Sequence, residues 1–508
     1  MLEEYNVSFA SNIYSYDIHH RISILQIIAD YNEGVDIAMI QERLPLNRRT
    51  IYKYIDEINN TAINDQNEAA EELGYIEKNN NTYRYVGNRL TYQRLYIRII
   101  ENSIQLLLCK QLLQNPIINI KQFCIDNYIS ETALRRNIAK FNTEMEPYQL
   151  SIALYKGNIR LSGEPEKIRF GITTFLWRIY RGVTWPFETV SQQLMKTIAK
   201  GIFKEYSIPD NDGKLNELMF ILATNFARSQ ANMFPISPVS NELVDILIFD
   251  EHDQRVLTQL TQNYGLAKND AQFVLLWLKT IPDYYLYRGR ALAIDRKLAS
   301  LNNPFHDTVH HFLDRIQTKM GLKIDLSTES GQNFLVSLIA GRIHVALFPD
   351  IDFTISNLNL VEVLEQNAPH LLANVKALLD PADIAQMSPV TLRALCIRYG
   401  YAFAAVQSLF YFEPTIKILV QLDSPSYIDA GFRNRLETLL QPFFNIKVQL
   451  HDIKNEADLV VHTDLFVNSN YPLEKQIYVH SQITTSDFNN LIERLNKIKA
   501  QQNTQLME

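Results

Sequence analysis

The sequence predicts a multi-domain, mainly α-helical protein that ends in a small α/β domain. With 508 residues, the chain is too long to fold around a single core. Apolar residues recur at helical spacing over most of its length, and strand-like runs alternate with helices only after about residue 412. A composition of 46% hydrophobic and 21% charged residues is typical of a folded chain.

The first elements come from an internal repeat. When the sequence is shifted by 83 positions, residues 36–59 fall on residues 119–142. The helix-capping residue types coincide, and so do the apolar positions. The caps Asp36 and Asn47 meet Asn119 and Ser130, and Ile37, Ile40, Leu46, Ile51, Ile55 and Ile58 meet Ile120, Phe123, Ile129, Leu134, Ile138 and Phe141. Each copy is a short helix, a tight connection and a longer helix, which predicts a helix-turn-helix.

The outward face of each longer helix is basic. In this motif the second helix enters the major groove with its N-terminus first, so the outward residues of its first turns determine its function. These residues are Arg48, Arg49, Tyr52 and Lys53 in the first copy and Arg135, Arg136 and Lys140 in the second. Guanidinium groups can bind phosphates or the O6/N7 edge of guanine. Both helices are therefore predicted to contact DNA.

A predicted β-hairpin follows each copy. Residues 74–87 form two strand-like runs around an Asn-rich turn, and residues 150–163 turn at Lys156-Gly157-Asn158. Arg84 and Arg160 occupy matching places on the return strands. With Lys156, they are predicted to touch the neighbouring DNA backbone or minor groove. The result is two winged helix-turn-helix units, at residues 1–90 and 91–166.

The acidic net charge of the chain argues against strong binding of DNA. The chain has a net charge of -7, and residues 1–165 hold roughly 17 Lys and Arg against about 20 Asp and Glu, some of them in the acidic stretch 65–74. Basic character is thus confined to faces, and DNA affinity is expected to be modest and steeply dependent on salt. Helix-turn-helix shapes also serve as packing modules, which is the alternative for these segments.

Other features place the chain among cytoplasmic non-enzymes. Its three cysteines form no CxxC pair, its N-terminus is acidic where a signal peptide is basic, and no apolar run reaches the roughly 18 residues of a membrane span. We find no GxxxxGK[ST] phosphate loop, GxGxxG turn or GxSxG elbow. Neither a cofactor nor a catalytic residue is predicted.

The chain resembles the Mga family of transcription regulators from Gram-positive bacteria, and the resemblance would cover essentially its whole length. The resemblance rests on the double helix-turn-helix, on residues 130–142 and on residues 159–182, where Gly163-Glu164-x-x-x-Ile168-Arg169 enters an aromatic helix. Family resemblance implies two helical PTS regulation domains, placed at 167–290 and 291–412. It also implies a domain at 413–508 similar to the IIB component of sugar phosphotransferase enzymes, and a role as an activator.

The remaining sequence fits that layout. Apolar helical segments such as 213–230 and 328–348 fill the middle of the chain, and a break at 284–304 is expected to separate two bundles. Strand-like runs are predicted at 416–423, 445–452, 457–464 and 475–481, with helices near 427–442 and 486–500. This order predicts a small, largely parallel sheet. The loop 423–431 lacks the cysteine that carries phosphate in a working IIB enzyme, so a sensing or dimer-forming role is expected.

The resemblance implies control by histidine phosphorylation in the helical domains. The candidates are His310, His344 and His370, and the alternative for each is an ordinary, partly buried imidazole. In the first helical domain, the stretch 228–234 has Asn232 and no histidine, which speaks against phosphorylation there.

One motif favours a different class of protein. His306 and His310 share a helix face with Asp307 between them, which resembles the HExxH zinc motif. Aspartate has a shorter side chain than glutamate, and no third ligand is evident in the neighbouring sequence. A metallohydrolase is therefore disfavoured, and no metal is predicted.

These observations together predict a regulator that binds double-stranded promoter DNA as a homodimer. A phosphotransferase-system phosphocarrier protein and RNA polymerase are its expected protein partners. The alternative is a sugar-system signalling protein that acts through protein partners and uses its helix-turn-helix units as docking surfaces.

Overall fold

The computed structural model divides the chain into two compact units. It describes residues 14–63, 73–231, 236, 239–355, 364, 367–422, 425–451, 455–463, 468 and 470–507. The first unit comprises Met1–His310, Leu335–Leu360 and Gln386–Leu395, and the second comprises His311–Phe334, Val361–Ala385 and Cys396–Glu508. The finer division into five domains stays a prediction.

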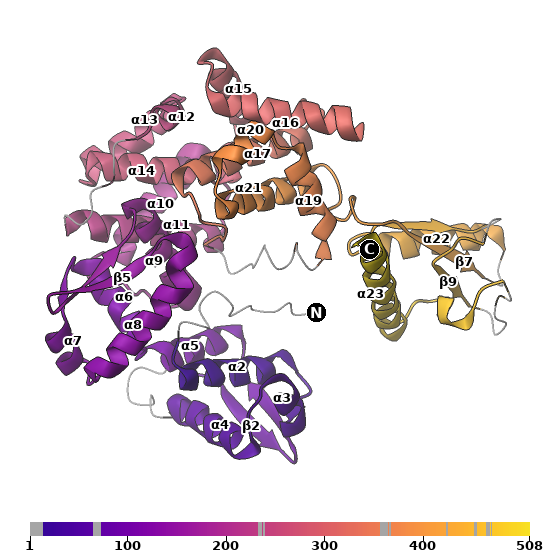
Figure 1. The fold of residues 1–508 in the computed structure, drawn as a ribbon, viewed down its shortest axis with the longest axis horizontal. Helices are drawn as coiled ribbons and strands as arrows, with labels where there is room; N and C mark the ends of the chain where they lie inside the picture. Colours follow the sequence, from indigo (N-terminus) through magenta and orange to yellow (C-terminus); the bar gives the residue numbers. More distant parts are fainter. Residues whose placement is uncertain are drawn as a thin grey trace. The chain divides into compact units, whose positions relative to one another are not determined.

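The first winged unit has the predicted helix-turn-helix and hairpin (Figure 1). Its elements are α2 (Tyr16–Asp30), β1 (Val35–Asp36), α3 (Ile37–Arg43), α4 (Arg48–Ile63), β2 (Tyr75–Asn79) and β3 (Thr82–Val86). The three strands form an antiparallel sheet in the order β1-β3-β2. Helix α2, which the repeat did not include, packs its buried isoleucines against α4.

The second winged unit repeats this arrangement. Helix α5 (Arg89–Ile100) leads into it, and its elements are α6 (Ile104–Gln114), β4 (Ile118–Asn119), α7 (Ile120–Asp126), α8 (Glu131–Met145), β5 (Ser151–Tyr155) and β6 (Asn158–Ser162). Its sheet has the order β4-β6-β5, which corresponds strand for strand to the first sheet. Ile120, Phe123, Leu134 and Ile138 form its core, as the periodicity predicted.

A helical region completes the first unit. Its helices include α9 (Pro165–Tyr180), α10 (Gln192–Tyr206), α11 (Asp212–Gln230), α12 (Asn241–Leu247), α13 (Glu251–Thr258), α14 (Lys268–Lys279), α15 (Arg290–Ser300), the start of α16 (Pro304–Met320), the C-terminal part of α17 (Glu329–Leu347) and the start of α21 (Pro389–Ala402). The described residues between β6 and residue 415 contain no strand, as predicted. Helix α15 fills most of the stretch 284–304, which was expected to separate two bundles.

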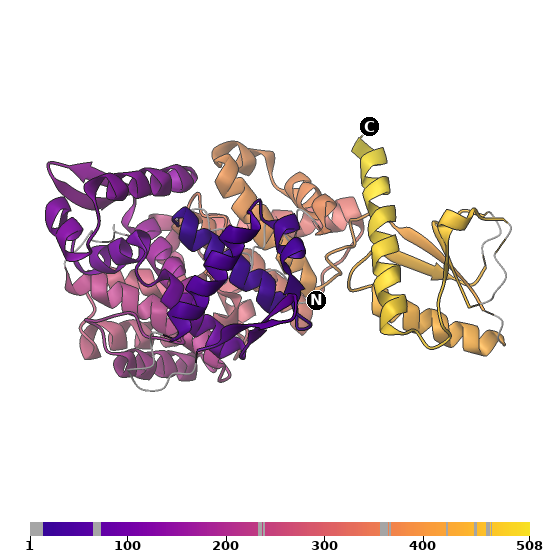
Figure 2. The ribbon, with the colours of Figure 1, turned by 90° about the horizontal axis from the view of Figure 1, so that it is seen from below.

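The second unit contains the predicted α/β fold. Strands β7 (Ile416–Gln421), β8 (Ile446–Gln449), β9 (Leu459–His462) and β10 (Gln476–Tyr478) form a sheet in the order β10-β9-β7-β8. All three strand pairs are parallel. Helices α22 (Ser426–Leu440) and α23 (Thr485–Met507) flank the strands in Figure 2 and share one apolar core with β7, β8 and β9. The short helices α19 (Pro369–Leu378) and α20 (Pro381–Gln386) precede them.

Some of the segments considered in the sequence lie outside the described residues. They are residues 65–72 of the acidic stretch, Asn232, and the first two residues of the loop 423–431. In the described part of the chain, no helix combines the length and the apolar character that crossing a bilayer requires.

Candidate nucleic-acid interface

The predicted caps hold the helix-turn-helix units in shape. Asp36 accepts a hydrogen bond from the Met39 backbone at 2.8 Å, and Asn119 accepts the equivalent bond at 3.1 Å. Asn47 and Ser130 cap α4 and α8 in the same way, at 2.9 and 3.1 Å. Each cap satisfies an N–H group that the first turn of a helix leaves unpaired. All four caps are confirmed, so the start of each recognition helix is determined locally.

An asparagine near the other end of each recognition helix ties it to the wing. The Asn59 side chain donates to the Ile76 carbonyl and accepts from the Ile76 N–H, both at 2.8 Å. Asn142 makes the same two bonds to Ile152, at 3.0 and 2.7 Å. Sequence reasoning missed this clamp, although Asn59 and Asn142 align at the offset of 83 residues and end the repeated segment. The clamp sets the angle between helix and hairpin.

The basic face of α4 projects into solvent. Arg48, Arg49, Tyr52 and Lys53 are all exposed. Arg48 donates to Gln41 at 3.4 Å, and Lys53 lies 3.5 Å from Glu57 one turn further along. These surface contacts are weak and leave the side chains able to turn toward a phosphate.

The face of α8 is exposed as well, but its cations differ in their partners. Arg135, Arg136 and Lys140 all reach solvent. Arg135 forms an ion pair of 2.6 Å with Glu131 on the preceding turn. Lys140 donates to the backbone carbonyl of Tyr14 at 2.7 Å, a contact across 126 residues that links α8 to the start of the first winged unit. Lys140 thus makes a contact within the protein, whereas Arg136, which follows Arg135 on the same helix, is exposed.

The two wings present their cations differently. Arg84 is bound to Glu77, the residue opposite it on β2, at 2.9 Å. Arg160 is opposite Ala153, and its guanidinium instead lies 5.7 Å from the ring centre of Tyr155. Lys156 contacts the same ring at 5.1 Å from the hairpin turn. The second wing therefore carries two cations around one exposed tyrosine, without a carboxylate opposite them.

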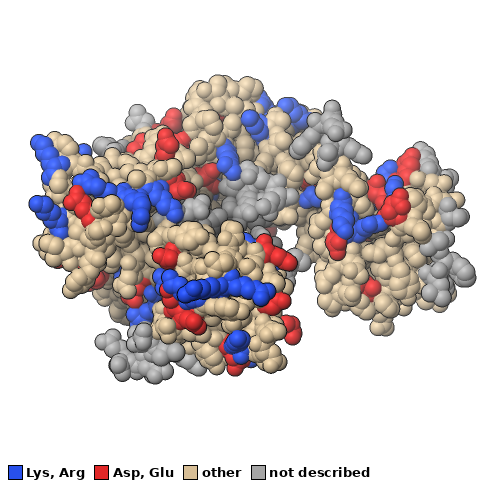
Figure 3. Space-filling model, turned by 60° about the horizontal axis from the view of Figure 1, so that its bottom comes forward, with Lys and Arg blue, Asp and Glu red and all other residues tan. Residues whose placement is uncertain are grey.

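Basic character is local, as the sequence predicted. On the face drawn in Figure 3, Lys and Arg side chains gather in short strips with Asp and Glu beside them. Electrostatic attraction between such a surface and an anion falls as salt screens the few charges involved.

The Gly163-Glu164-x-x-x-Ile168-Arg169 motif joins the second winged unit to the helical region. Gly163 has φ +144°, and a Cβ there would lie 2.7 Å from Leu150 and 3.0 Å from the Gln149 carbonyl. Only glycine fits this close approach of β6 to the chain before β5. The turn directs the chain into α9, whose first turns are buried.

Two buried cations follow that turn. Lys167 is 3.3 Å from Asp350, and the Arg169 guanidinium is 2.7 Å from Asp270 and 2.8 Å from the Asn225 side chain. Burial would raise the pKa of Asp350, but hydrogen bonds from Ser388, Lys167 and Thr391 outweigh it and hold that pKa below the usual range. The motif is thus a structural anchor rather than part of the exposed basic faces.

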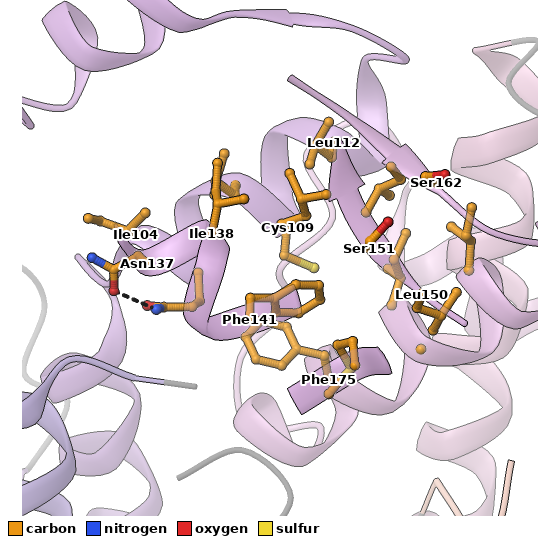
Figure 4. A pocket seen from close by; sticks show the side chains of 18 of the residues that line it. Ile104, Cys109, Leu112, Asn137, Ile138, Phe141, Leu150, Ser151, Ser162 and Phe175 are labelled. Atoms are coloured by element: carbon orange, nitrogen blue, oxygen red, sulfur yellow. Dashed lines mark hydrogen bonds between the residues drawn. The ribbon is translucent and has the colours of Figure 1, made fainter. Parts of the chain in front are cut away.

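An apolar cavity of about 80 Å³ lies behind α8. Figure 4 shows Cys109, Phe141 and Leu150 around it, with the Gln105–Asn137 hydrogen bond at one side. Burial raises the pKa of the Cys109 thiol to about 12, which keeps it protonated at neutral pH. The cysteine is a core side chain, and the inner face of α8 is incompletely packed.

The three candidate histidines have different surroundings. His344 is buried, with its Nε2 3.4 Å from the Ile351 carbonyl and its ring against Phe170 and Phe348. In the second unit, His370 is half-buried and its Nε2 lies 3.1 Å from Asn503. His310 is also half-buried, with its Nε2 2.8 Å from Asp295.

The predicted absence of a third ligand beside His306 and His310 is wrong. Asp295 on α15 contacts His310, and the ligand atoms of Asp295, His306 and His310 lie within 4.8 Å of one another. Asp307, the residue in the position of the HExxH glutamate, instead lies 3.1 Å from His306 Nδ1. Asp295 precedes the motif by one helix, so the HExxH pattern alone does not include it.

Comparison with known families identifies the second winged unit. Residues 88–176 match the family model of the Mga helix-turn-helix domain. The match begins just before α5, covers the unit from α6 to β6 and ends inside α9, so it includes both the α8 face and the Gly163 turn. It confirms the resemblance to the Mga family over this part of the chain. The chain matches no curated protein.

Proposed function

From the Mga helix-turn-helix domain at residues 88–176, we propose that the chain is a transcription regulator that binds promoter DNA through two winged units. The single observation that carries the proposal is the exposure of Arg135 and Arg136 at the N-terminal part of α8, within this domain. In a helix-turn-helix these positions face the major groove and the flanking phosphates.

The first winged unit supports the proposal because it repeats the second one. Its caps, strand order and asparagine clamp are the same, and its α4 presents Arg48 and Arg49 at the corresponding end. Two such units in one chain offer two sites for consecutive stretches of DNA, and binding at both raises the effective affinity of a modest basic surface. A homodimer would double this number again.

We further propose control by the phosphotransferase system. Of the three candidate histidines, His310 has the best geometry, because it is half-buried and its Nε2 contacts the Asp295 carboxylate. A carboxylate partner fixes the tautomer and makes the imidazole a better nucleophile toward a phosphocarrier protein. His344 is buried at 3% exposure, so phosphoryl transfer to it requires α17 to open. Activation through RNA polymerase belongs to the same proposal.

The test is a gel-shift titration of the full chain with its own upstream DNA at several salt concentrations. Arg135→Ala with Arg136→Ala is expected to weaken binding at least about tenfold and to lower the slope of log affinity against log salt by about 2, since two phosphate-neutralising cations are lost.

The matched control is Lys196→Ala with Lys200→Ala. These are two exposed cations on α10, outside both winged units. An equal effect of the control pair, or an unchanged salt slope in the arginine variant, would refute α8 as the DNA-contacting helix. A protein that binds no DNA but retains protein partners would instead favour the docking alternative.

A further inference from the structure

We propose that Asp295, His306 and His310 form a binding site for a divalent transition-metal ion of the Zn²⁺ class. The three side chains offer two imidazole nitrogens and one carboxylate oxygen, all within 4.8 Å of one another. The fourth position of a tetrahedral ion is left for water or another ligand.

The two histidines are arranged on α16 as a chelating pair. They lie four residues apart on one helical face, and their ring centres are 4.2 Å apart with an angle of 31° between the planes. Two imidazoles in this register reach one ion without any change of backbone, because side chains at i and i+4 lie one above the other.

The carboxylate comes from the preceding helix. Asp295 on α15 lies 2.8 Å from His310 Nε2. Around a tetrahedral Zn²⁺ with bonds of about 2.0–2.2 Å, neighbouring ligand atoms are about 3.3–3.6 Å apart. The Asp295–His310 contact of 2.8 Å therefore has to widen by about 0.5–0.8 Å. Small rotations achieve this, because the side chains of Asp295, His306 and His310 are 15%, 22% and 32% exposed.

A second carboxylate supports the site from outside. Asp307 lies 3.1 Å from His306 Nδ1, which leaves Nε2 as the nitrogen that His306 offers to the ion. A carboxylate on the far nitrogen of a metal-bound histidine fixes its tautomer and raises its basicity. The carboxylates of Asp295 and Asp307 also favour a cation at this position by their negative charge.

The donor set selects the kind of metal. Imidazole ligands suit Zn²⁺, Ni²⁺, Cu²⁺ and Co²⁺, whereas Mg²⁺ and Ca²⁺ prefer sites built from oxygen alone. A bound ion would link α15 to α16 more strongly than the Asp295–His310 hydrogen bond does by itself. The ion would take up His310 Nε2 and Asp295, and so would replace the contact between them on which the proposed phosphorylation of His310 depends.

The experiment uses the full chain without a histidine tag, freed of metal by a chelator and titrated with Zn²⁺ and with Co²⁺. Calorimetry is expected to give about one ion per chain, and Co²⁺ to develop the visible absorption of a four-coordinate site. His306→Gln and Asp295→Asn should each weaken binding at least about tenfold. Circular dichroism melting checks that both variants are folded.

His311→Gln is the matched control, because His311 is the exposed neighbour of His310 on the same helix and does not belong to the cluster. It should bind like the unchanged protein. A stoichiometry far below one ion per chain, or equal losses in the control and the two site variants, would overturn the proposal. So would binding of Mg²⁺ as tight as that of Zn²⁺.

Discussion

Carboxylates of the protein itself compete with DNA for the cations of the proposed interface. Arg135 is held by Glu131, Arg84 by Glu77 and Lys53 by Glu57. Each pair is exposed, so each contributes little to stability. Near a DNA phosphate, however, the carboxylate both pairs with the cation that would bind the phosphate and repels the DNA. The acids therefore reduce affinity more than they stabilise the fold.

Glu131→Gln should strengthen DNA binding about two- to fivefold at low salt, because it frees Arg135 and removes one negative charge at the start of α8. Gel shifts measure the change. Glu146→Gln removes the same charge just beyond the other end of α8 and should have almost no effect. Weaker binding by the Glu131 variant would show that the ion pair instead holds Arg135 in its binding position.

Glu217 on α11 gives a prediction about pH. Burial raises its pKa to about 7, against the opposing charge of Arg181. An acid whose folded pKa is raised stabilises the fold fully below its unfolded pKa, and this stability is lost as the pH rises through the folded value. As the pH rises from about 4.5 to 7, Glu217 should thus cost the protein about 3 kcal/mol of unfolding free energy, because each unit of pKa difference corresponds to about 1.4 kcal/mol.

Glu217→Gln removes this titration and should make the protein more stable than the unchanged chain at pH 8, with little difference at pH 4.5. Thermal or urea unfolding at the two pH values measures the difference. Equal stability of the two proteins at pH 8 would contradict the raised pKa.

At the scale of single elements, α9 depends on buried ion pairs. Arg169 is 1% exposed and is matched by Asp270 and Asn225 from α14 and α11. A buried charge without its partner is costly, whereas an apolar replacement of the whole pair is often tolerated. The pair therefore specifies how the winged unit is attached to the helices.

Asp270→Ala should destabilise the chain by about 3–5 kcal/mol, because it leaves the Arg169 guanidinium buried and unpaired. Denaturant unfolding measures the loss. Adding Arg169→Leu to this variant should recover a large part of the lost stability. If the double variant is no more stable than Asp270→Ala alone, the lost stability comes from packing and not from the unpaired charge of Arg169.

For the whole molecule, net charge and DNA binding have to be reconciled. The chain carries a net charge of -7, yet both winged units present exposed arginines at the start of the second helix of the helix-turn-helix. If the protein binds DNA as proposed, long-range attraction is therefore small, and affinity has to come from short-range contacts of the two winged units.

If both units bind one DNA molecule, the salt slope should fall by about 2 for Arg48→Ala with Arg49→Ala, by about 2 for the Arg135 and Arg136 pair, and by about 4 when all four are replaced. Titrations of the full chain at four or more salt concentrations give these slopes. An unchanged slope for the Arg48 and Arg49 variant would restrict DNA contact to the second unit.

The sequence by itself determined the features that depend on neighbouring residues. Helical and alternating periodicity, four caps and two hairpin turns predicted both winged units, and strand-like runs predicted the parallel sheet of the second unit. Such signals act within a few residues, so they are present in the chain before it folds.

Only the tertiary structure decided which distant side chains meet. Asp295 joins His306 and His310, Asp270 joins Arg169, and Lys140 is bound by the Tyr14 carbonyl. No local pattern encodes these contacts, because each depends on how segments that are distant in the sequence pack against one another. For the same reason the aligned Asn59 and Asn142 were visible as a repeat, while their role as clamps was not.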